Sequence, residues 1–274
     1  RKSAPDTVVS GQIINAMQEK GSEYLKKYPN MYFVYPSLPI LANLKPEYPE
    51  RVIDTGITEE HCMMFASALA AAGNKVLMSI YGYFLLRAYD QLTEACEQQG
   101  QLIINVMTNS ISQHGPNHQT VYLRGVIKQT PPLSIMEPAM LLEYEQMLDF
   151  CLSYDKPVAI MVPYTLFNDR SVEFPYPSEG IDIQPGKGVV FKQGDRLTVA
   201  SLGSFFPEAL KLSQELEGVE LIHPRFLKPF DWELLQKSVA KTGSLLLLEE
   251  NAKRSSSAAD IALYLLEKGV QCNI

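Results

Sequence analysis

The chain has 274 residues, of which 46% are hydrophobic and 20% are charged, and its formal net charge is −7. This composition is that of a globular protein with enough apolar residues to build a sizeable core in one large or two medium domains. The acidic balance argues against a protein that binds the phosphate backbone of nucleic acids, because that task requires clustered lysines and arginines.

The sequence also argues against membrane contact. Its most apolar stretch, residues 76–86, contains Ser79 and Gly82 and is too short to span a bilayer. No basic segment followed by an apolar run, as in a secretory signal, opens the chain. The four cysteines show no metal-ligand spacing and are interpreted as free thiols. We therefore expect a cytoplasmic protein.

Hydrophobic periodicity predicts alternating helices and strands over the first 160 or so residues. The expected helices lie at residues 10–26, 59–72, 83–99 and 138–154. The expected strands lie at residues 31–35, 75–80, 102–107, 133–136 and 158–162. Strands that alternate with helices favour an α/β fold with a mostly parallel, doubly wound sheet.

Residues 165–187 interrupt this pattern with several prolines and glycines and few apolar runs, which indicates a linker. Beyond it we expect strands at 197–202, 219–223 and 244–248, and helices at 206–216, 231–242 and 256–268. This second unit is a smaller α/β domain. The predicted organisation is a first domain at residues 1–166, a linker at 167–187 and a second domain at 188–274.

The first segment that suggests chemistry is Asp-Thr-Gly-Ile-Thr-Glu-Glu-His at residues 54–61. Glu59 stands at the start of a predicted helix, where an acidic residue is favoured by the helix dipole alone. A catalytic carboxylate would need a dry pocket, and the apolar residues at 63–65 could line one. Glu60 is the rival for such a role.

The second segment is an aromatic and basic cluster at residues 81–91. By residue type alone, Tyr81 and Phe84 are typical core aromatics. Arg87 fits equally well an active-site role or a salt bridge to Asp90 or Glu94 of the same helix.

The third segment is a loop, His-Gly-Pro-Asn-His-Gln, at residues 114–119. Gly115 and Pro116 fix a turn there, and a turn of this kind presents His118 from a loop. Histidine can shuttle protons and stabilise a developing alkoxide near neutral pH.

These three segments, in this order, resemble the pyrimidine-binding half of thiamine diphosphate enzymes of the transketolase superfamily, and most nearly 1-deoxy-D-xylulose-5-phosphate synthase. Residues 223–231 and 248–251 resemble the C-terminal domain of the same superfamily. Nothing in the sequence resembles the Gly-Asp-Gly and Asn-Asn signature that binds magnesium and diphosphate. The resemblance thus implies one subunit of a split enzyme. A second subunit would carry the diphosphate-binding domain and hold most of the Mg²⁺ site, in an α2β2 heterotetramer with a homodimer contact.

The resemblance assigns roles to individual residues. In the superfamily a buried glutamate hydrogen-bonds the aminopyrimidine of the cofactor and promotes removal of the thiazolium proton, and Glu59 matches it. Phe84 matches the residue that stacks on the pyrimidine, and Tyr81 matches a neighbour that faces the substrate channel. We assign these three residues to cofactor binding and no residue to metal binding.

Four further residues are assigned to the substrate. His118 matches a catalytic histidine that faces the reactive carbon, and Arg87 matches an arginine of the active-site region. His114 occupies the position of an aspartate in the synthase. Tyr164 replaces an arginine that grips the acceptor's phosphate in the synthase, and residues 108–113 lack a second such arginine.

We therefore expect a thiamine diphosphate-dependent transferase, active with a partner subunit, that transfers an acyl or ketol unit to a small carbonyl acceptor other than a phosphorylated triose. One alternative is the beta subunit of a 2-oxo-acid dehydrogenase decarboxylase component, a class that lacks the Gly-Pro-x-His pattern. The other is a non-catalytic partner subunit of the same fold.

Overall fold

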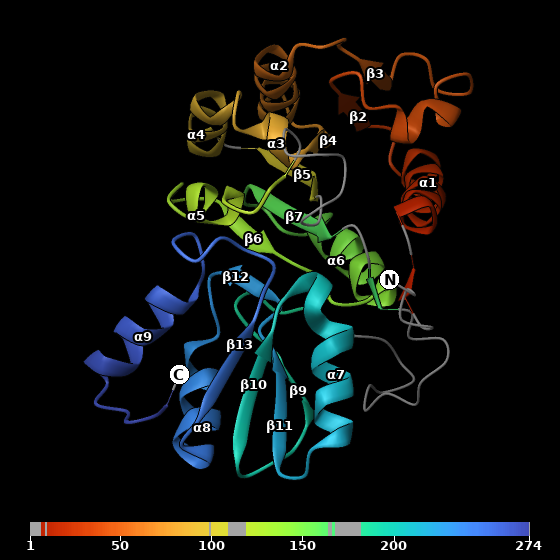
Figure 1. Ribbon diagram of the computed structural model, residues 1–274. Coiled ribbons are helices and arrows are strands. Elements are labelled where there is room, and N and C mark those ends of the chain that lie inside the picture. Colours follow the sequence, from red (N-terminus) through yellow and green to blue (C-terminus); the bar gives the residue numbers. More distant parts are fainter. Residues whose placement is uncertain are drawn as a thin grey trace.

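The computed structural model describes residues 7–8, 10–98, 100–108, 119–163, 166–167 and 182–273. It has the predicted α/β architecture, with a seven-stranded sheet, a smaller four-stranded sheet and a two-stranded ribbon (Figure 1). The helices are α1 (Ser10–Lys27), α2 (Glu59–Ala71), α3 (Gly82–Leu85), α4 (Tyr89–Glu97), α5 (Leu123–Ile127), α6 (Leu141–Cys151), α7 (Phe206–Glu215), α8 (Trp232–Thr242) and α9 (Ala258–Glu267), with 3₁₀ turns η1 (Pro39–Leu44) and η4 (Gly203–Phe205). The strands are β1 (Thr7–Val8), β2 (Met31–Tyr35), β3 (Val52–Asp54), β4 (Lys75–Tyr81), β5 (Gln101–Thr108), β6 (Ser134–Met136), β7 (Val158–Pro163), β8 (Leu166–Phe167), β9 (Val189–Lys192), β10 (Leu197–Ser201), β11 (Val219–His223), β12 (Phe226–Lys228) and β13 (Leu245–Leu248).

The large sheet has the order β12-β6-β7-β5-β4-β2-β3. All its neighbouring strands are parallel except β12, which runs antiparallel to β6. Both faces are buried, as is usual for a parallel sheet, so its strands are almost continuously apolar. In β7, for example, Ile160 joins the core on one face and Met161 the core on the other.

Helices cover both faces of this sheet (Figure 1). α1 and α6 bury Ile13, Met17 and Met147 on one face, and α2 and α4 bury Met63 and Leu92 on the other. The core that α1 and α6 form with the large sheet also includes side chains of β11 and α7. α6 therefore lies between the large sheet and the small one. The two sheets therefore share one continuous hydrophobic core on this side.

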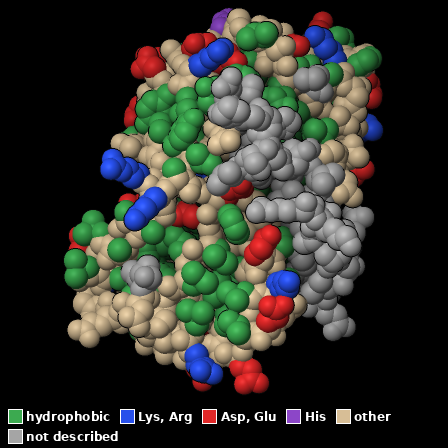
Figure 2. Space-filling model, viewed as in Figure 1, with side chains coloured by type: hydrophobic (Ala, Val, Ile, Leu, Met, Phe, Trp, Pro, Cys, Tyr) green, Lys and Arg blue, Asp and Glu red, His purple; other side chains and the backbone are tan. Residues whose placement is uncertain are grey.

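The small sheet has the order β13-β10-β11-β9, with β9 antiparallel and the other pairs parallel. α7 packs on one face, and α8 and α9 pack on the other through Leu235, Val239 and Ile261. β13 is an edge strand of this sheet, and its Leu246 is 37% exposed. Figure 2 shows further hydrophobic side chains on the surface over this sheet.

The second half of the chain also contributes to the large sheet. β12 lies beyond the predicted linker, yet Phe226 pairs with Met136 and Lys228 pairs with Ile135 of β6. The predicted domain limits at residues 166 and 188 remain a prediction.

Two expected helices differ from the structure. The helix expected at residues 83–99 is divided into α3 and α4, because the N–H groups of Arg87 and Ala88 bond three residues back and tighten the chain into a turn. The helix expected at 138–154 is shorter. It begins at Leu141, and the Glu143 carboxylate accepts a 2.8 Å hydrogen bond from the N–H of Ala139 in the extended segment before it.

Within the described part of the chain, no helix combines the length and apolarity needed to cross a bilayer.

Candidate active site

A cavity of about 230 Å³ opens at the carboxyl ends of β2, β3 and β4. β3 pairs with one edge of β2, and β4, β5 and β7 then follow in turn from the other edge of β2. The order of the strands therefore reverses between β2 and β4. Ligands of doubly wound α/β proteins bind at such a switch point. The lining residues are Pro36, Ser37, Ile57, Glu59, Ile80, Tyr81, Phe84 and Arg87.

One aspartate joins the loops after β2 and β3, which contribute residues to the cavity. The Oδ1 atom of Asp54 accepts hydrogen bonds from the N–H of Ser37, at 3.0 Å, and from the N–H of Gly56, at 2.9 Å. Ser37 has a φ of 53°, which is unusual for a residue other than glycine. Backbone strain of this kind is concentrated at functional sites. Asp54 thus fixes the loops after β2 and β3 relative to each other.

Glu59 is the first residue of α2 and is only 3% exposed. Its carboxylate lies at the positive end of the helix dipole, and its Oε2 atom is 3.5 Å from Nη1 of Arg87. Cys62, less than one turn further along the helix, adds no charge beside it, because burial raises the pKa of this thiol to about 11. Among the described residues, the cavity therefore contains one buried carboxylate, with one cationic neighbour.

Aromatic side chains form one wall of the cavity. The rings of Tyr81 and Phe84 meet edge to face, with centroids 6.3 Å apart, and Tyr83 packs on Phe84 in the same manner at 5.7 Å. The Arg87 guanidinium carbon lies 5.4 Å from the centroid of the Phe84 ring, within the range of a cation–π contact. The wall is thus held in place on both sides of Phe84.

Gly82 allows this wall to form. A Cβ atom at this position would lie 2.7 Å from Cδ2 of Leu123 and 3.0 Å from Cγ2 of Thr120. The turn from β4 into α3 therefore rests directly on the segment that leads into α5.

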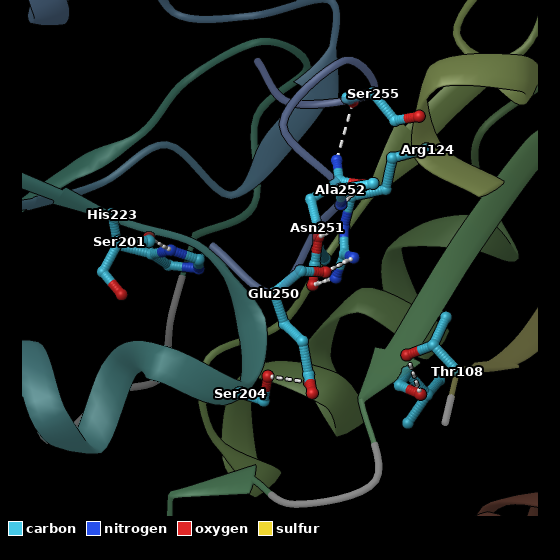
Figure 3. A network of polar contacts seen from close by, with 11 residues as sticks. Thr108, Arg124, Ser201, Ser204, His223, Glu250, Asn251, Ala252 and Ser255 are labelled. Carbon is cyan, nitrogen blue, oxygen red and sulfur yellow. Dashed lines mark hydrogen bonds and ion pairs between the residues drawn. The ribbon is translucent and has the colours of Figure 1, made fainter. Parts of the chain in front are cut away.

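α5 is in turn fixed by a buried polar network (Figure 3). Arg124 is 3% exposed, and its Nε donates a 2.8 Å hydrogen bond to Glu137 at the end of β6. Its Nη1 donates to the backbone carbonyl of Glu250 at 2.6 Å, and the Glu250 carboxylate accepts a 2.7 Å hydrogen bond from Ser204. Residues near the small sheet thereby hold the element that supports the aromatic wall.

The structure brings together four of the residues singled out from the sequence: Glu59, Tyr81, Phe84 and Arg87. Glu60, the rival carboxylate, is exposed. The sequence left two roles open for Arg87, and its described ion pair is with Glu59 rather than with Asp90 or Glu94. Its side chain points back across the turn after α3 rather than along α4.

His114, His118 and Tyr164 lie outside the described residues, so their assigned roles remain predictions.

Sequence reasoning missed Ser37, Ile57 and the linking role of Asp54. The Asp-Thr-Gly sequence at residues 54–56 is a turn signal and could have indicated Asp54. Nothing in the sequence around Ser37 marks its positive φ. Among the described residues, no group of three or more histidine, cysteine or acidic side chains is arranged to hold a metal ion.

Comparison with protein families identifies the two parts of the chain. The model of the transketolase pyrimidine-binding domain matches residues 38–169, and the model of the transketolase C-terminal domain matches residues 186–273. The chain belongs to the transketolase family. Six of the eight residues that line the candidate site lie in the part that matches the transketolase pyrimidine-binding domain. The other two, Pro36 and Ser37, directly precede it.

Several transketolase-family relatives of this chain are 1-deoxy-D-xylulose-5-phosphate synthases. The synthase of Lachnoclostridium phytofermentans is 29% identical over 234 residues, covering 82% of this chain and 36% of the relative. That of Chlamydia trachomatis is 28% identical over 258 residues, covering 91% and 40%. That of Desulfotalea psychrophila is 30% identical over 229 residues, covering 81% and 35%. The chain thus spans about 35–40% of the length of these relatives.

Solved structures of transketolases share the fold. A split-gene transketolase, solved as an inactive β4 tetramer, superposes with a TM-score of 0.79 at 23% identity, covering 95% of this chain and 86% of that one. Transketolase from Campylobacter jejuni gives a TM-score of 0.69 at 14% identity, covering 88% of this chain and 40% of that one. These structures confirm the predicted fold class, and the two matching domain models confirm the predicted family.

Proposed function

We propose that this chain is one subunit of a split, thiamine diphosphate-dependent enzyme of the transketolase family, which transfers an acyl or ketol unit to a carbonyl acceptor. The observation that carries the proposal is the buried carboxylate of Glu59, at the start of α2, facing a cavity walled by Tyr81 and Phe84. In this family the pyrimidine-binding domain needs such a carboxylate beside an aromatic platform.

The residues of the cavity fit an aminopyrimidine ring. The space of about 230 Å³ is small, and it is walled largely by apolar side chains with one carboxylate and one guanidinium. Binding sites of this kind combine apolar walls with a few polar groups that fix the orientation of a ligand. Phe84 is half-buried and offers ring surface for stacking, and Glu59 offers a hydrogen-bond partner for a ring nitrogen.

Bound thiamine diphosphate would supply the carbon nucleophile of the reaction. Glu59 would hold a proton in a hydrogen bond to the pyrimidine and orient that ring. Phe84 would exclude water from one face of the ring, and Tyr81 would line the entrance for the substrate. Arg87, at the exposed rim, would attract an anionic or hydroxyl-rich substrate. His118, and with it His114 and Tyr164, would complete the substrate side.

Two surface features support contacts with other subunits, one of which would supply the diphosphate-binding domain and most of the Mg²⁺ site. Ile57 is 75% exposed beside the cavity, where a large apolar side chain favours burial against another protein. The edge strand β13 presents Leu246 to solvent and suits a homodimer contact in an α2β2 assembly.

The first experiment is a calorimetric titration of the purified chain with thiamine diphosphate and magnesium. The chain alone should bind with a dissociation constant weaker than about 1 mM, because a cofactor held at both ends loses its metal–diphosphate anchor when one subunit is absent. Addition of the co-purifying partner should bring the constant to the micromolar range. Micromolar, magnesium-dependent binding by the chain alone would contradict the split-subunit proposal.

The same reconstituted pair separates the alternatives. Transfer of an acyl group to a lipoyl-bearing protein would identify the beta subunit of a 2-oxo-acid dehydrogenase. Tight cofactor binding that does not depend on Glu59, without any turnover, would identify a non-catalytic subunit.

A further inference from the structure

A second and larger cavity, of about 670 Å³, lies at the edge of the large sheet opposite the candidate active site. Its walls are formed by the segments that lead into the amino ends of β5, β6 and β7, namely residues 96–98, 100, 131–134 and 154–157, and by Lys228 and Pro229 at the end of β12. The volume is within the range of small-molecule binding sites. Because the candidate active site lies at the carboxyl ends of the strands, this cavity is separate from it.

The walls of this cavity are mostly apolar and rigid. Pro131, Pro132, Pro157 and Pro229 line it, together with Leu133. Proline rings have no rotamer freedom to lose when a ligand packs against them, so they provide apolar contact at little entropic cost.

Lys228 is the least exposed of the four charged residues that line this cavity. Its side chain is half-buried, and its Nζ donates hydrogen bonds to the backbone carbonyls of Lys128, at 3.1 Å, and of Thr130. An ammonium group has three N–H donors, so one remains after these two. In the described part of the chain Lys228 forms no ion pair. Burial lowers the pKa of Lys228, and an anion beside it would favour the charged form again.

We propose that this cavity is a binding site for a small organic anion, whose charged head contacts Lys228 and whose compact apolar body packs against the proline rings. Lys156 at the rim adds a second positive charge. Two exposed carboxylates, those of Glu97 and Asp155, also line the rim and oppose an anion from the water side. The site therefore selects an anion that places its charge deep in the cavity beside Lys228 rather than at the mouth.

The test is a calorimetric titration of the full chain with phenyl phosphate, benzoate and inorganic phosphate. Phenyl phosphate or benzoate should bind with a dissociation constant of about 1 mM or tighter, and inorganic phosphate should bind more weakly because it lacks the apolar body. The stronger of the two aromatic ligands identifies whether the site prefers a phosphate or a carboxylate head. Absence of binding by both at several millimolar would overturn the proposal.

Variants locate the binding. Lys228→Gln should weaken it at least tenfold, since a hydrogen bond to a charged group is lost. Lys211→Gln is the matched control, because Lys211 is exposed on α7 and does not line the cavity. This control variant should bind the anion with the affinity of the wild type.

A third variant does not depend on Lys228, whose hydrogen bonds also support the fold. Asp155→Asn removes a negative charge from the exposed rim without touching the core, and it should strengthen binding about two- to threefold. An affinity that is the same in wild type, Lys228→Gln and Asp155→Asn would show that the anion binds elsewhere and would overturn the proposal.

Discussion

The Oε2 atom of Glu59 lies 3.5 Å from Nη1 of Arg87, and the two side chains differ sharply in exposure, at 4% and 55%. The carboxylate is thus held inside the candidate active site by α2, while the guanidinium remains largely in water. Water screens the exposed guanidinium and weakens its attraction to the carboxylate. A ligand that reaches Glu59 can therefore replace Arg87 at small cost and leave it free to contact a substrate at the rim.

Glu59→Gln should abolish turnover in the enzyme assembled with its partner, with fold and assembly intact. The amide is nearly the same size as the carboxylate, but it cannot hold and release a proton at the pyrimidine. General acid–base catalysis of this kind contributes about 10²–10⁴-fold. The measurement is hydrogen–deuterium exchange at the thiazolium carbon of bound cofactor, which reports proton removal directly.

Glu60→Gln is the matched control for this prediction. Glu60 is the next residue on the same helix, but its side chain is exposed and does not line the cavity. Exchange in this variant should remain close to that of the wild type. Equal loss in the two variants, or loss in Glu60→Gln alone, would mean that the catalytic carboxylate has been assigned wrongly.

Gly82→Ala should destabilise the chain by about 1–3 kcal/mol, which is typical of overpacking in a core. The added Cβ would lie within 3.0 Å of both Leu123 and Thr120, and both of these residues are buried. α3 would have to move, and with it the Phe84 wall. Urea unfolding gives the change in the free energy of unfolding.

Gly11→Ala provides the opposite case, because a Cβ at this exposed position in α1 would meet nothing within 4 Å. That variant should be unchanged or more stable, by up to about 1 kcal/mol. If Gly82→Ala were as stable as Gly11→Ala, the space between α3 and the segment before α5 would be wide enough for a Cβ atom, contrary to this prediction.

Glu143 should make the stability of the protein dependent on pH in the acid range. Burial acts to raise the pKa of this carboxyl, but the charges and hydrogen bonds of His223 and Arg225 outweigh burial and lower the pKa from 4.5 to about 2. Because the folded pKa is below the unfolded value, the stabilisation is complete above about pH 4.5 and is lost as the pH falls towards 2.

Glu143→Gln tests this linkage. Near pH 7 it should cost about 3–5 kcal/mol, since it removes the charge of a buried carboxylate that pairs with Arg225 and His223. The difference in the free energy of unfolding between the wild type and this variant should shrink by about 3 kcal/mol as the pH falls from 4.5 to 2. Urea unfolding across this range gives the values, with the exposed Glu19→Gln as control. A difference that is independent of pH would contradict the assignment.

The sequence predicted the elements with long periodic patterns and missed several of the short ones. α2, β4 and β7 were placed to within one or two residues, because each has a sustained apolar pattern. β3 and β12 have three residues each, too few to show any period, and β12 forms only through its pairing with β6. In the site, Glu59 and Phe84 were identified from the family motif. Ser37 could not be, because it contributes a backbone N–H and a positive φ rather than a characteristic side chain.

The acceptor should not be a phosphorylated triose held as in the synthase. The family resemblance places Tyr164 where the synthase has one phosphate-gripping arginine, and residues 108–113 contain no basic residue that could replace the other. Within the described part of the chain, Arg87 is the one cation that lines the candidate active site, and its charge is shared with Glu59.

Each charge-assisted hydrogen bond of this kind contributes roughly 1.5–3 kcal/mol, so the loss of two should weaken a phosphate ester by about two orders of magnitude or more. The measurement is a competition between glyceraldehyde and glyceraldehyde 3-phosphate as acceptors for the reconstituted pair, with pyruvate as donor. The ratio of the two kcat/KM values should not favour the phosphate ester. Tyr164→Arg should shift the ratio towards the ester, because it restores one bidentate contact. A strong preference of the wild type for the phosphorylated acceptor would show that other residues, including residues of the partner subunit, have rebuilt the phosphate site.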